Sequence, residues 1–153
     1  MKNKKIISAN SGQTKKLGEK LAKEILMARL GEKAAVLALD GNLGSGKTTF
    51  LQGFAKGLKI KEKILSPTFI IFRKIKIPGR KNFLFFYHFD CYRVKKKKEI
   101  MELGFEKIIS GKKNIVAIEW PKSIKNMLPK QAVILKFRFI DKSSREVIIN
   151  MQK

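Results

Sequence analysis

The residues with the clearest chemical meaning lie in one short glycine-rich segment. It begins at Gly41, ends at Thr48 and fits the pattern G-x-x-x-x-G-K-S/T. Triphosphate oxygens must be met by converging backbone N–H groups, and glycines at Gly41, Gly44 and Gly46 let the backbone come that close. Lys47 supplies a positive charge for the β and γ phosphates, and the Thr48 hydroxyl is placed to contact Mg²⁺. The segment therefore predicts a binding site for a nucleoside triphosphate and Mg²⁺.

The segments on either side of this loop have the order that such a site requires. Residues 34–39 form a short apolar run suited to a buried parallel strand. After the loop, Phe50, Phe54 and Leu58 recur four residues apart, which predicts a helix over residues 49–58. The amino terminus of that helix would direct its unpaired N–H groups and its dipole at the phosphates. The sequence of strand, loop and helix favours a phosphate-binding loop over a chance match.

Two acidic residues end apolar segments that are typical of buried strands. Asp90 follows the run 83–89, and Glu119 ends the run 114–119. Hydrolysis of a nucleotide needs an acid that holds Mg²⁺, directly or through water, and a group that orients the attacking water. We interpret both acids as candidates for these roles, because they would lie beside the phosphate loop. The alternative for each is an acid that only accepts a hydrogen bond from a loop.

The rest of the chain predicts further strands and helices. Ser11 would cap the first helix and Gly31 would end it, and the turn residues 78–81 favour an antiparallel hairpin. The predicted strands are 4–9, 34–39, 63–65, 70–77, 83–89, 114–119, 132–140 and 145–151, and the predicted helices are 11–31, 49–58, 99–109 and 123–128. This order predicts an α/β fold of the P-loop NTPase-like class, a three-layer sandwich. Its mixed parallel and antiparallel sheet would carry helices on both faces and the nucleotide at the carboxyl ends of the parallel strands.

Length and composition limit the kind of protein this can be. A chain of 153 residues fits one P-loop ATPase domain, residues 1–153, which buries about two-thirds of its unfolded surface. No apolar run approaches the roughly 20 residues of a membrane span, and the amino terminus lacks the apolar centre of a signal peptide. We therefore expect a cytoplasmic protein without membrane contact. Cys91 is the only cysteine, and we expect it to serve in packing.

The charge balance is strongly basic, with 35 lysines and arginines against 12 acidic residues and a net charge of +23. Such a charge favours nucleic acid, because basic proteins release counterions from the phosphate backbone. Arginine, the usual residue for bidentate phosphate contacts, accounts for only six of the 35 basic residues. The lysine excess is also typical of proteins from adenine- and thymine-rich genomes. The high positive charge is therefore compatible with a functional basic surface and equally with the base composition of the genome.

Several separated motifs resemble the TsaE family, formerly called YjeE, the small bacterial ATPases of tRNA threonylcarbamoyladenosine biosynthesis. The resemblance covers nearly the whole chain. The motifs are Ser11-x-x-Thr14-x-x-Leu17-Gly18, the loop from Gly41 to Phe50, Ser66-Pro67-Thr68-Phe69, His88-Phe89-Asp90-x-Tyr92-Arg93, Ile118-Glu119-Trp120-Pro121, Leu128-Pro129 and Arg145-Glu146. Two positions depart from the family pattern. Asn42 stands where an Asp is usual, which removes a charge beside the triphosphate, and Cys91 stands where an aliphatic residue is usual.

The resemblance implies an ATP-binding and ATP-hydrolysing accessory protein. It would be required for threonylcarbamoylation of adenosine 37 in tRNAs that read codons beginning with A. The transfer itself would be done by the TsaB–TsaD complex, and tRNA would be met through that complex. The implied catalytic residues are Lys47, Asp90, Glu119 and Thr68, with Thr68 as the switch that senses the γ phosphate, and the implied Mg²⁺ ligands are Thr48, Asp90 and Glu119.

The resemblance also implies which residues contact the nucleotide and what the neighbouring residues do. The nucleotide would contact Ser11, Thr14, Gly41, Asn42, Leu43, Gly44, Ser45, Gly46, Lys47, Thr48, Thr49 and Arg145. We interpret His88 as a residue that aims Asp90 rather than as a general base. Trp120 is interpreted as packing or as part of a partner surface.

Rival functions use the same phosphate loop. A small P-loop kinase needs a second substrate pocket and usually an arginine-rich lid, and six arginines are few for a lid. A GTPase is expected to carry an Asn-Lys-x-Asp segment for guanine, and the sequence has none. A nucleotide-gated RNA-binding module, in which hydrolysis is incidental, stays open because of the basic charge.

Overall fold

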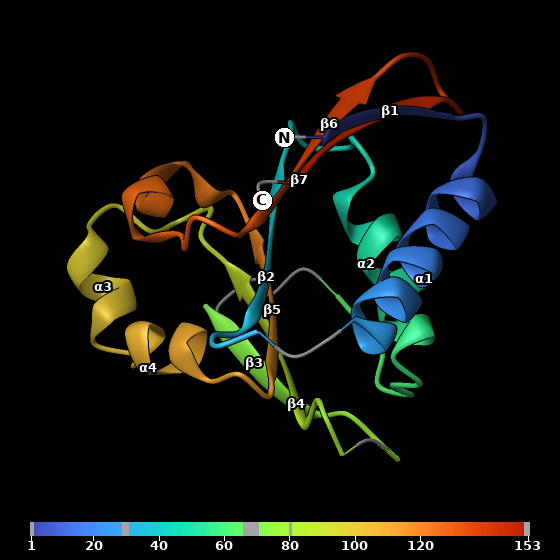
Figure 1. Cartoon of the computed structure of the whole chain (residues 1–153). Helices are drawn as coiled ribbons and strands as arrows, with labels where there is room; N and C mark the ends of the chain where they lie inside the picture. The colour runs from blue at the N-terminus through green and yellow to red at the C-terminus, as the bar shows by residue number, and fades with distance from the viewer. Residues whose placement is uncertain (1, 29–30, 66–70, 80, 152–153) are drawn as a thin grey trace.

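A seven-stranded sheet in the order β1-β7-β6-β2-β5-β4-β3 forms the centre of the molecule (Figure 1). The computed structural model describes residues 2–28, 31–65, 71–79 and 81–151. The strands are β1 (Lys2–Ser8), β2 (Ala35–Asp40), β3 (Phe72–Lys76), β4 (Phe85–Asp90), β5 (Asn114–Glu119), β6 (Val133–Phe139) and β7 (Arg145–Met151). The helices are α1 (Ser11–Met27), α2 (Lys47–Gly57), α3 (Lys97–Met101), α4 (Phe105–Ser110) and the 3₁₀ helix η1 (Pro121–Met127).

Strand direction in this sheet is mixed, as predicted. The four central strands β6, β2, β5 and β4 run parallel to one another. On one side β7 is antiparallel to β6 and β1 is antiparallel to β7, and on the other side β3 is antiparallel to β4. The carboxyl ends of the parallel strands therefore meet at one edge of the sheet. That edge is where open α/β sheets bind their ligands.

Helices cover the sheet on both faces, which confirms the predicted three-layer arrangement. Figure 1 shows α1 and α2 on one side of the sheet and α3 and α4 on the other. Each layer encloses its own apolar core. Phe50, Phe54, Leu37 and Phe86 belong to the core under α1 and α2, and Phe89, Phe105, Ile118 and Ile124 belong to the other. Strands β2 and β5 are buried on both faces, which explains why they read as continuous apolar runs rather than alternating ones.

The helices α1 and α2 approach each other closely because glycines lie at their contact. A Cβ atom built on Gly18 of α1 would lie 2.1 Å from the Phe50 carbonyl oxygen. A Cβ on Gly53 of α2 would lie 1.9 Å from the Lys15 carbonyl oxygen. Any side chain at these positions would force the backbones apart. The close approach ties the second and third turns of α1 to α2, which begins at Lys47 in the phosphate loop.

The ends of α1 differ from the prediction. The cap is Asn10 rather than Ser11, and its side chain accepts a hydrogen bond of 2.9 Å from the Gln13 backbone N–H. The helix ends at Met27, before Gly31, and the Ala28 N–H bonds back to the helix. Asn10 and Ser11 are both good capping residues, and sequence alone placed the cap one residue late.

Two other predicted elements were wrong. The single helix predicted over 99–109 is divided into α3 and α4, because Gly104 between them has a left-handed backbone with φ of 79°. The strand predicted over 63–65 is absent, and this segment is irregular. It is held instead by side chains: the amide of Gln52 contacts the Ile64 carbonyl at 3.5 Å, and Arg73 donates to the Lys63 carbonyl at 3.2 Å. Ile64 is buried whereas Leu65 is 55% exposed, so one apolar side chain anchors this segment without a strand partner.

The remaining elements agree with the prediction to within a few residues. The closing hairpin is present, and β7 has its predicted bounds at Arg145–Met151. The predicted helix over 123–128 is the 3₁₀ helix η1, which starts earlier at Pro121. Within the described ranges, no helix has the length and apolar character needed to cross a membrane.

Candidate functional site

The loop between β2 and α2 has the backbone that a phosphate cradle needs. Gly44 and Gly46 have left-handed φ angles of 76° and 104°, which favour glycine. A Cβ on Gly41 would lie 2.6 Å from the Ser45 hydroxyl and 2.7 Å from the Phe137 carbonyl oxygen, so a side chain does not fit there. A Cβ on Gly44 would meet no atom within 4 Å, so this backbone lines open space. The loop thus brings its backbone to the cavity at the start of α2, with the Ser45 N–H bonded to the Asn42 carbonyl oxygen at 3.1 Å.

Lys47 is held in place by groups of the protein itself. Its side chain is buried, its ammonium donates to the Gly41 carbonyl oxygen, and Nζ lies 3.7 Å from the centre of the Trp120 ring. Burial lowers the pKa of Lys47, and the negative charges of Glu119, Asp40 and Asp90 oppose that shift. The lysine is therefore pre-positioned at the loop rather than free in solvent.

The two predicted acids lie side by side at the carboxyl ends of β4 and β5. Asp90 is directly opposite Glu119 in the register of these strands. The Oδ1 atom of Asp90 accepts a 3.0 Å hydrogen bond from the Tyr92 backbone N–H. Burial raises the pKa of Asp90, and the Glu119 charge raises it further against the opposing Tyr92 hydrogen bond. A raised pKa is what two adjacent carboxylates at a partly buried site produce.

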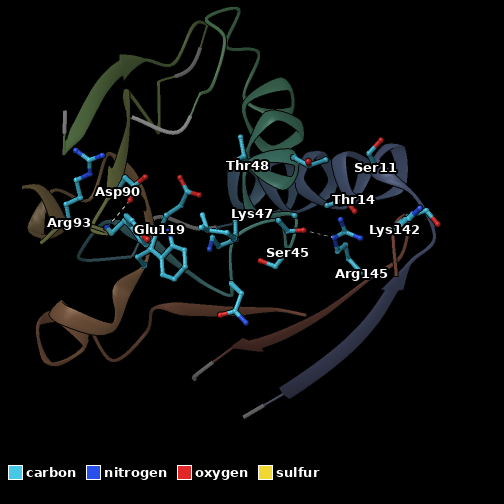
Figure 2. Close-up of a pocket in the computed structure, with 18 of the residues that line it drawn as sticks. Ser11, Thr14, Ser45, Lys47, Thr48, Asp90, Arg93, Glu119, Lys142 and Arg145 are labelled. Atoms are coloured by element: carbon cyan, nitrogen blue, oxygen red, sulfur yellow. Dashed lines mark hydrogen bonds between the residues drawn. The ribbon is translucent and has the colours of Figure 1, made fainter. Parts of the chain in front are cut away.

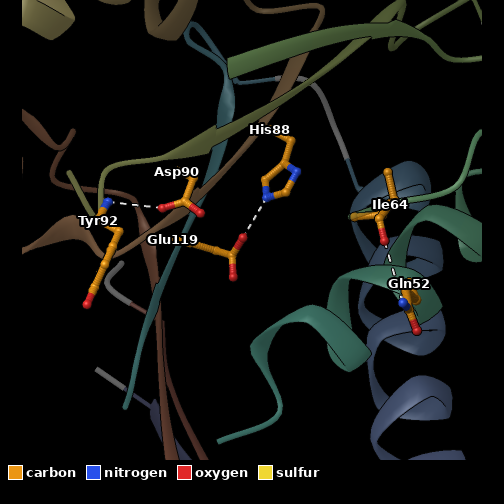
Figure 3. Close-up of polar contacts among 6 residues, drawn as sticks. All are labelled: Gln52, Ile64, His88, Asp90, Tyr92 and Glu119. Atoms are coloured by element: carbon orange, nitrogen blue, oxygen red, sulfur yellow. Dashed lines mark hydrogen bonds and ion pairs between the residues drawn. The ribbon is translucent and has the colours of Figure 1, made fainter. Parts of the chain in front are cut away.

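His88 does not aim Asp90, and the interpretation from sequence was wrong on this point. Its Nε2 atom lies 2.7 Å from Oε2 of Glu119, and both side chains are buried (Figure 3). His88 and Asp90 are two residues apart and share a face of β4, so the sequence was compatible with a contact between them. In the register of β4 with β5, His88 lies opposite Ala117 and Glu119 is its diagonal neighbour, and the imidazole reaches Glu119 rather than Asp90.

The residues predicted to contact the nucleotide from outside the loop lie at the other end of the site (Figure 2). The Arg145 guanidinium forms hydrogen bonds within the protein. Its Nε donates to the Gly44 carbonyl oxygen at 3.0 Å. Its Nη1 donates to the carbonyl oxygens of Asp141 at 2.7 Å and Ser144 at 2.9 Å. The Thr14 hydroxyl is 2.6 Å from the Ser8 hydroxyl and is buried. The Arg145 contact ties β7 to the phosphate loop, and the Thr14 contact ties α1 to the end of β1, so both residues have a structural role whatever else they touch.

A single cavity of about 940 Å³ joins these groups. Figure 2 shows Lys47 and Thr48 between one end with Asp90, Arg93 and Glu119 and another with Ser11, Thr14 and Arg145. Of the predicted site residues, Ser11, Thr14, Asn42, Leu43, Gly44, Ser45, Gly46, Lys47, Thr48, Thr49, Asp90, Glu119 and Arg145 line it. Gly41 lies behind the wall, where its carbonyl holds Lys47. Thr68 falls outside the described residues, so its role stays a prediction.

Sequence reasoning missed other residues of the wall. They are Asn10, Ile71, Tyr92, Arg93, Glu99, Trp120, Lys142 and Ser143. Tyr92 and Arg93 lie in a motif quoted for its acid, and Trp120 directly follows Glu119, so their neighbourhood carried a signal. Trp120 has a left-handed φ of 55°, an unfavourable value for an aromatic residue that turns its ring toward Lys47. Lys142 and Ser143 belong to a hairpin turn with no such signal.

The parallel strands, the glycine-rich loop and the helix that follows it define a P-loop NTPase-like fold. A family model described as "Threonylcarbamoyl adenosine biosynthesis protein TsaE" matches residues 8–147. The chain belongs to the TsaE family.

Curated relatives and a solved structure agree with this assignment. The tRNA threonylcarbamoyladenosine biosynthesis protein TsaE of Treponema pallidum is 33% identical over 81% of this chain and 87% of its own length. The protein of the same name from Bacillus subtilis is 32% identical over 96% of this chain and 85% of its own length. The crystal structure of YdiB from Bacillus subtilis superposes with a TM-score of 0.77 at 26% identity, covering 99% of this chain and 87% of that one.

Proposed function

We propose that this chain binds ATP with Mg²⁺ and hydrolyses it in support of tRNA threonylcarbamoylation. The product would be threonylcarbamoyladenosine at position 37 of tRNAs that read codons beginning with A. One observation carries the proposal: a buried lysine of a phosphate-binding loop and two adjacent carboxylates face the same cavity. The names of the relatives, tRNA threonylcarbamoyladenosine biosynthesis protein, supply the biological context.

The residues present fit a triphosphate. The backbone at Gly44 borders open space, and the Ser45 hydroxyl is buried without a hydrogen-bond partner among the residues that the structure describes, so it offers an unused donor. Lys47 adds a fixed positive charge at the start of α2, where the helix dipole favours an anion. These groups line one cavity, and together they suit several phosphate oxygens better than a single carboxylate.

The acids fit Mg²⁺. In the part of the chain that the structure describes, no group of three or more His, Cys, Asp and Glu side chains is arranged to hold a metal ion. Mg²⁺ in nucleotide sites needs fewer protein ligands, because one or two carboxylates, waters and phosphate oxygens complete its shell. Thr48, Asp90 and Glu119 would hold it here. When bound, the ion neutralises charge on the phosphates and polarises them toward attack.

The side chains would divide the remaining work. Lys47 would bind the β and γ phosphates and stabilise charge that develops on them. Glu119, whose Oε2 is held by His88, would present a fixed carboxylate to the metal or to the attacking water. Asp90 would lie beside it with its own backbone donor from Tyr92. Thr68 would sense the γ phosphate as a switch.

The group transfer itself would be done by the TsaB–TsaD complex, with this chain as its ATPase. The basic charge gives one specific reason to keep a second candidate, an RNA-binding module gated by nucleotide. In that case the chain alone would bind tRNA with an affinity that depends on the nucleotide.

The test is a reconstitution. ATP turnover is measured for the chain alone and with TsaB and TsaD, and modified tRNA is assayed in the same reactions. The proposal expects turnover that rises with the partners and modification that requires both ATP and this chain. Modification that proceeds equally well without this chain would contradict the biological role, and absence of turnover under every condition would contradict the ATPase activity.

A further inference from the structure

His88 is the only histidine of the chain, and it lies on β4 behind the wall of the cavity. Its side chain is 1% exposed, and it does not line the cavity that Asp90 and Glu119 line. Its contact with Oε2 of Glu119, at 2.7 Å, is nevertheless a buried bond to an acid of the site. Figure 3 shows the imidazole directed at one oxygen of Glu119 while the other oxygen points away from it.

Strand register makes this contact possible. In the pairing of β4 with β5, His88 lies opposite Ala117 and Asp90 lies opposite Glu119. His88 and Glu119 are therefore diagonal neighbours on one face of the sheet, within reach of long side chains. Ala117 is small, so the imidazole has room to lean along the sheet toward the acid. The neighbouring Phe86 ring, 6.5 Å away and nearly parallel at 13°, supports the imidazole from the other side.

The charged side chains of the site, Glu119, Asp90 and Lys47, are each held by a different partner. Asp90 has its own donor in the Tyr92 N–H, so the two carboxylates do not compete for one partner. Lys47 is held by the Gly41 carbonyl and by the Trp120 ring. Within the described ranges no ion pair joins Lys47 to either acid, although their charges interact across the site. The site therefore keeps its lysine and its carboxylates apart, each on a separate support.

We propose that His88 is a positioning residue for Glu119. With its proton on Nε2, the imidazole donates to Oε2, which fixes the side-chain conformation of Glu119 and leaves Oε1 for the cavity. The hydrogen bond thereby prevents the Glu119 carboxylate from rotating to form an ion pair with Lys47. In such an ion pair neither side chain would be available to a ligand. This inference rests on the proposed function, since it concerns the acid that would serve Mg²⁺. Buried partners of this kind typically change metal affinity or activity about 10- to 100-fold.

Three substitutions of His88 distinguish the effect of its hydrogen bond to Glu119 from the effect of its side-chain volume. His88→Gln keeps an N–H donor that reaches the position of Nε2. His88→Asn is equally polar but one methylene shorter, so its donor falls short of Glu119. His88→Leu fills similar space without a donor. Thermal unfolding is measured first, because a buried carboxylate that loses its donor destabilises the fold. If His88→Leu does not fold, the pair of Gln and Asn variants carries the test.

The main measurement is the Mg²⁺ concentration that half-saturates thermal stabilisation by ATP, with turnover measured alongside. We expect this concentration to rise about 10- to 100-fold in His88→Leu and His88→Asn, and His88→Gln to recover most of the loss. Each change is repeated in a Glu119→Gln background. There the His88 variants should have no further effect, because His88 acts through the carboxylate. Equal losses in both backgrounds, or folded Leu and Asn variants with wild-type Mg²⁺ dependence, would overturn the assignment.

The positioning role of His88 and the proposed ATPase activity can be refuted independently. Wild-type protein that binds ATP with Mg²⁺ but does not hydrolyse it would refute the ATPase activity, yet the Mg²⁺ titration would still test His88. Conversely, a hydrolysing wild type with unaffected His88 variants would retain the function and refute only the positioning role.

Discussion

Replacing Gly18 by alanine tests whether the close contact of α1 and α2 supports the site. The added Cβ would lie 2.1 Å from the Phe50 carbonyl oxygen and 2.8 Å from the Phe54 nitrogen, whereas ordinary contacts begin at 3.4 Å. The two backbones must therefore separate by about 1.3 Å, the difference between 3.4 Å and 2.1 Å. Both neighbours are backbone atoms of a helix, so no side chain can rotate away.

The expected cost is the balance of two effects. Overpacking of this kind typically costs about 1–3 kcal/mol, and sometimes more. Alanine in place of glycine within a helix returns about 0.5–1 kcal/mol. The balance is a net loss of about 1 kcal/mol, which corresponds to a fall in Tm of about 2–4 °C for a chain of this length. ATP binding should weaken as well, because α1 carries Ser11 and Thr14 into the cavity and α2 begins at the phosphate loop.

Thermal unfolding followed by circular dichroism, with and without ATP, measures both effects. Gly31→Ala is the matched control, since its Cβ would meet nothing nearer than 3.9 Å and should change stability by no more than about 0.5 kcal/mol. A Gly18→Ala variant that unfolds at the same temperature as the Gly31→Ala control and binds ATP normally would refute the reasoning.

Other predictions follow from the same site. Lys47→Ala should abolish stabilisation by ATP in thermal unfolding while the protein without ATP stays folded, and unchanged ATP affinity would contradict the loop assignment. Burial raises the pKa of Cys91 to about 12, so its neutral thiol should not react with a thiol reagent at pH 8 until the protein is denatured; rapid labelling of native protein would disagree. Binding of the chain alone to tRNA should weaken steeply with salt and show little sequence preference, whereas tight binding to one anticodon loop at physiological salt would favour the RNA-binding module.

The sequence predicted the parts of the fold that depend on local pattern. The glycine spacing around Lys47, the apolar runs of β2 and β5 and the acids that end β4 and β5 all have periodicities or positions that can be read directly. Parallel strands then bring their carboxyl ends together without further information. For this reason Lys47, Asp90 and Glu119 could be placed at one site before the fold was known.

Two of the features that sequence missed depend on contacts between distant segments, and a third depends on the backbone of a single glycine. The bond from His88 to Glu119 follows from the register of β4 and β5, which neither segment encodes alone. Lys142 reaches the cavity only because the β6–β7 hairpin folds over the loop, where Arg145 binds Gly44. The break between α3 and α4 rests on the left-handed backbone of one glycine, which a helical pattern hides.

The most direct test of the central claim is ATP turnover by Glu119→Gln. The change keeps the size of the side chain and removes the charge, so a carboxylate that only accepts the His88 hydrogen bond should lose at most about 1–3 kcal/mol of stability. A carboxylate that serves Mg²⁺ or the attacking water is needed in the transition state, where its loss typically costs about 10²-fold or more in rate. We predict a folded protein that still binds ATP at millimolar Mg²⁺ and has lost turnover, alone and with TsaB and TsaD. Turnover within about twofold of wild type would contradict the account and remove Glu119 from the active site.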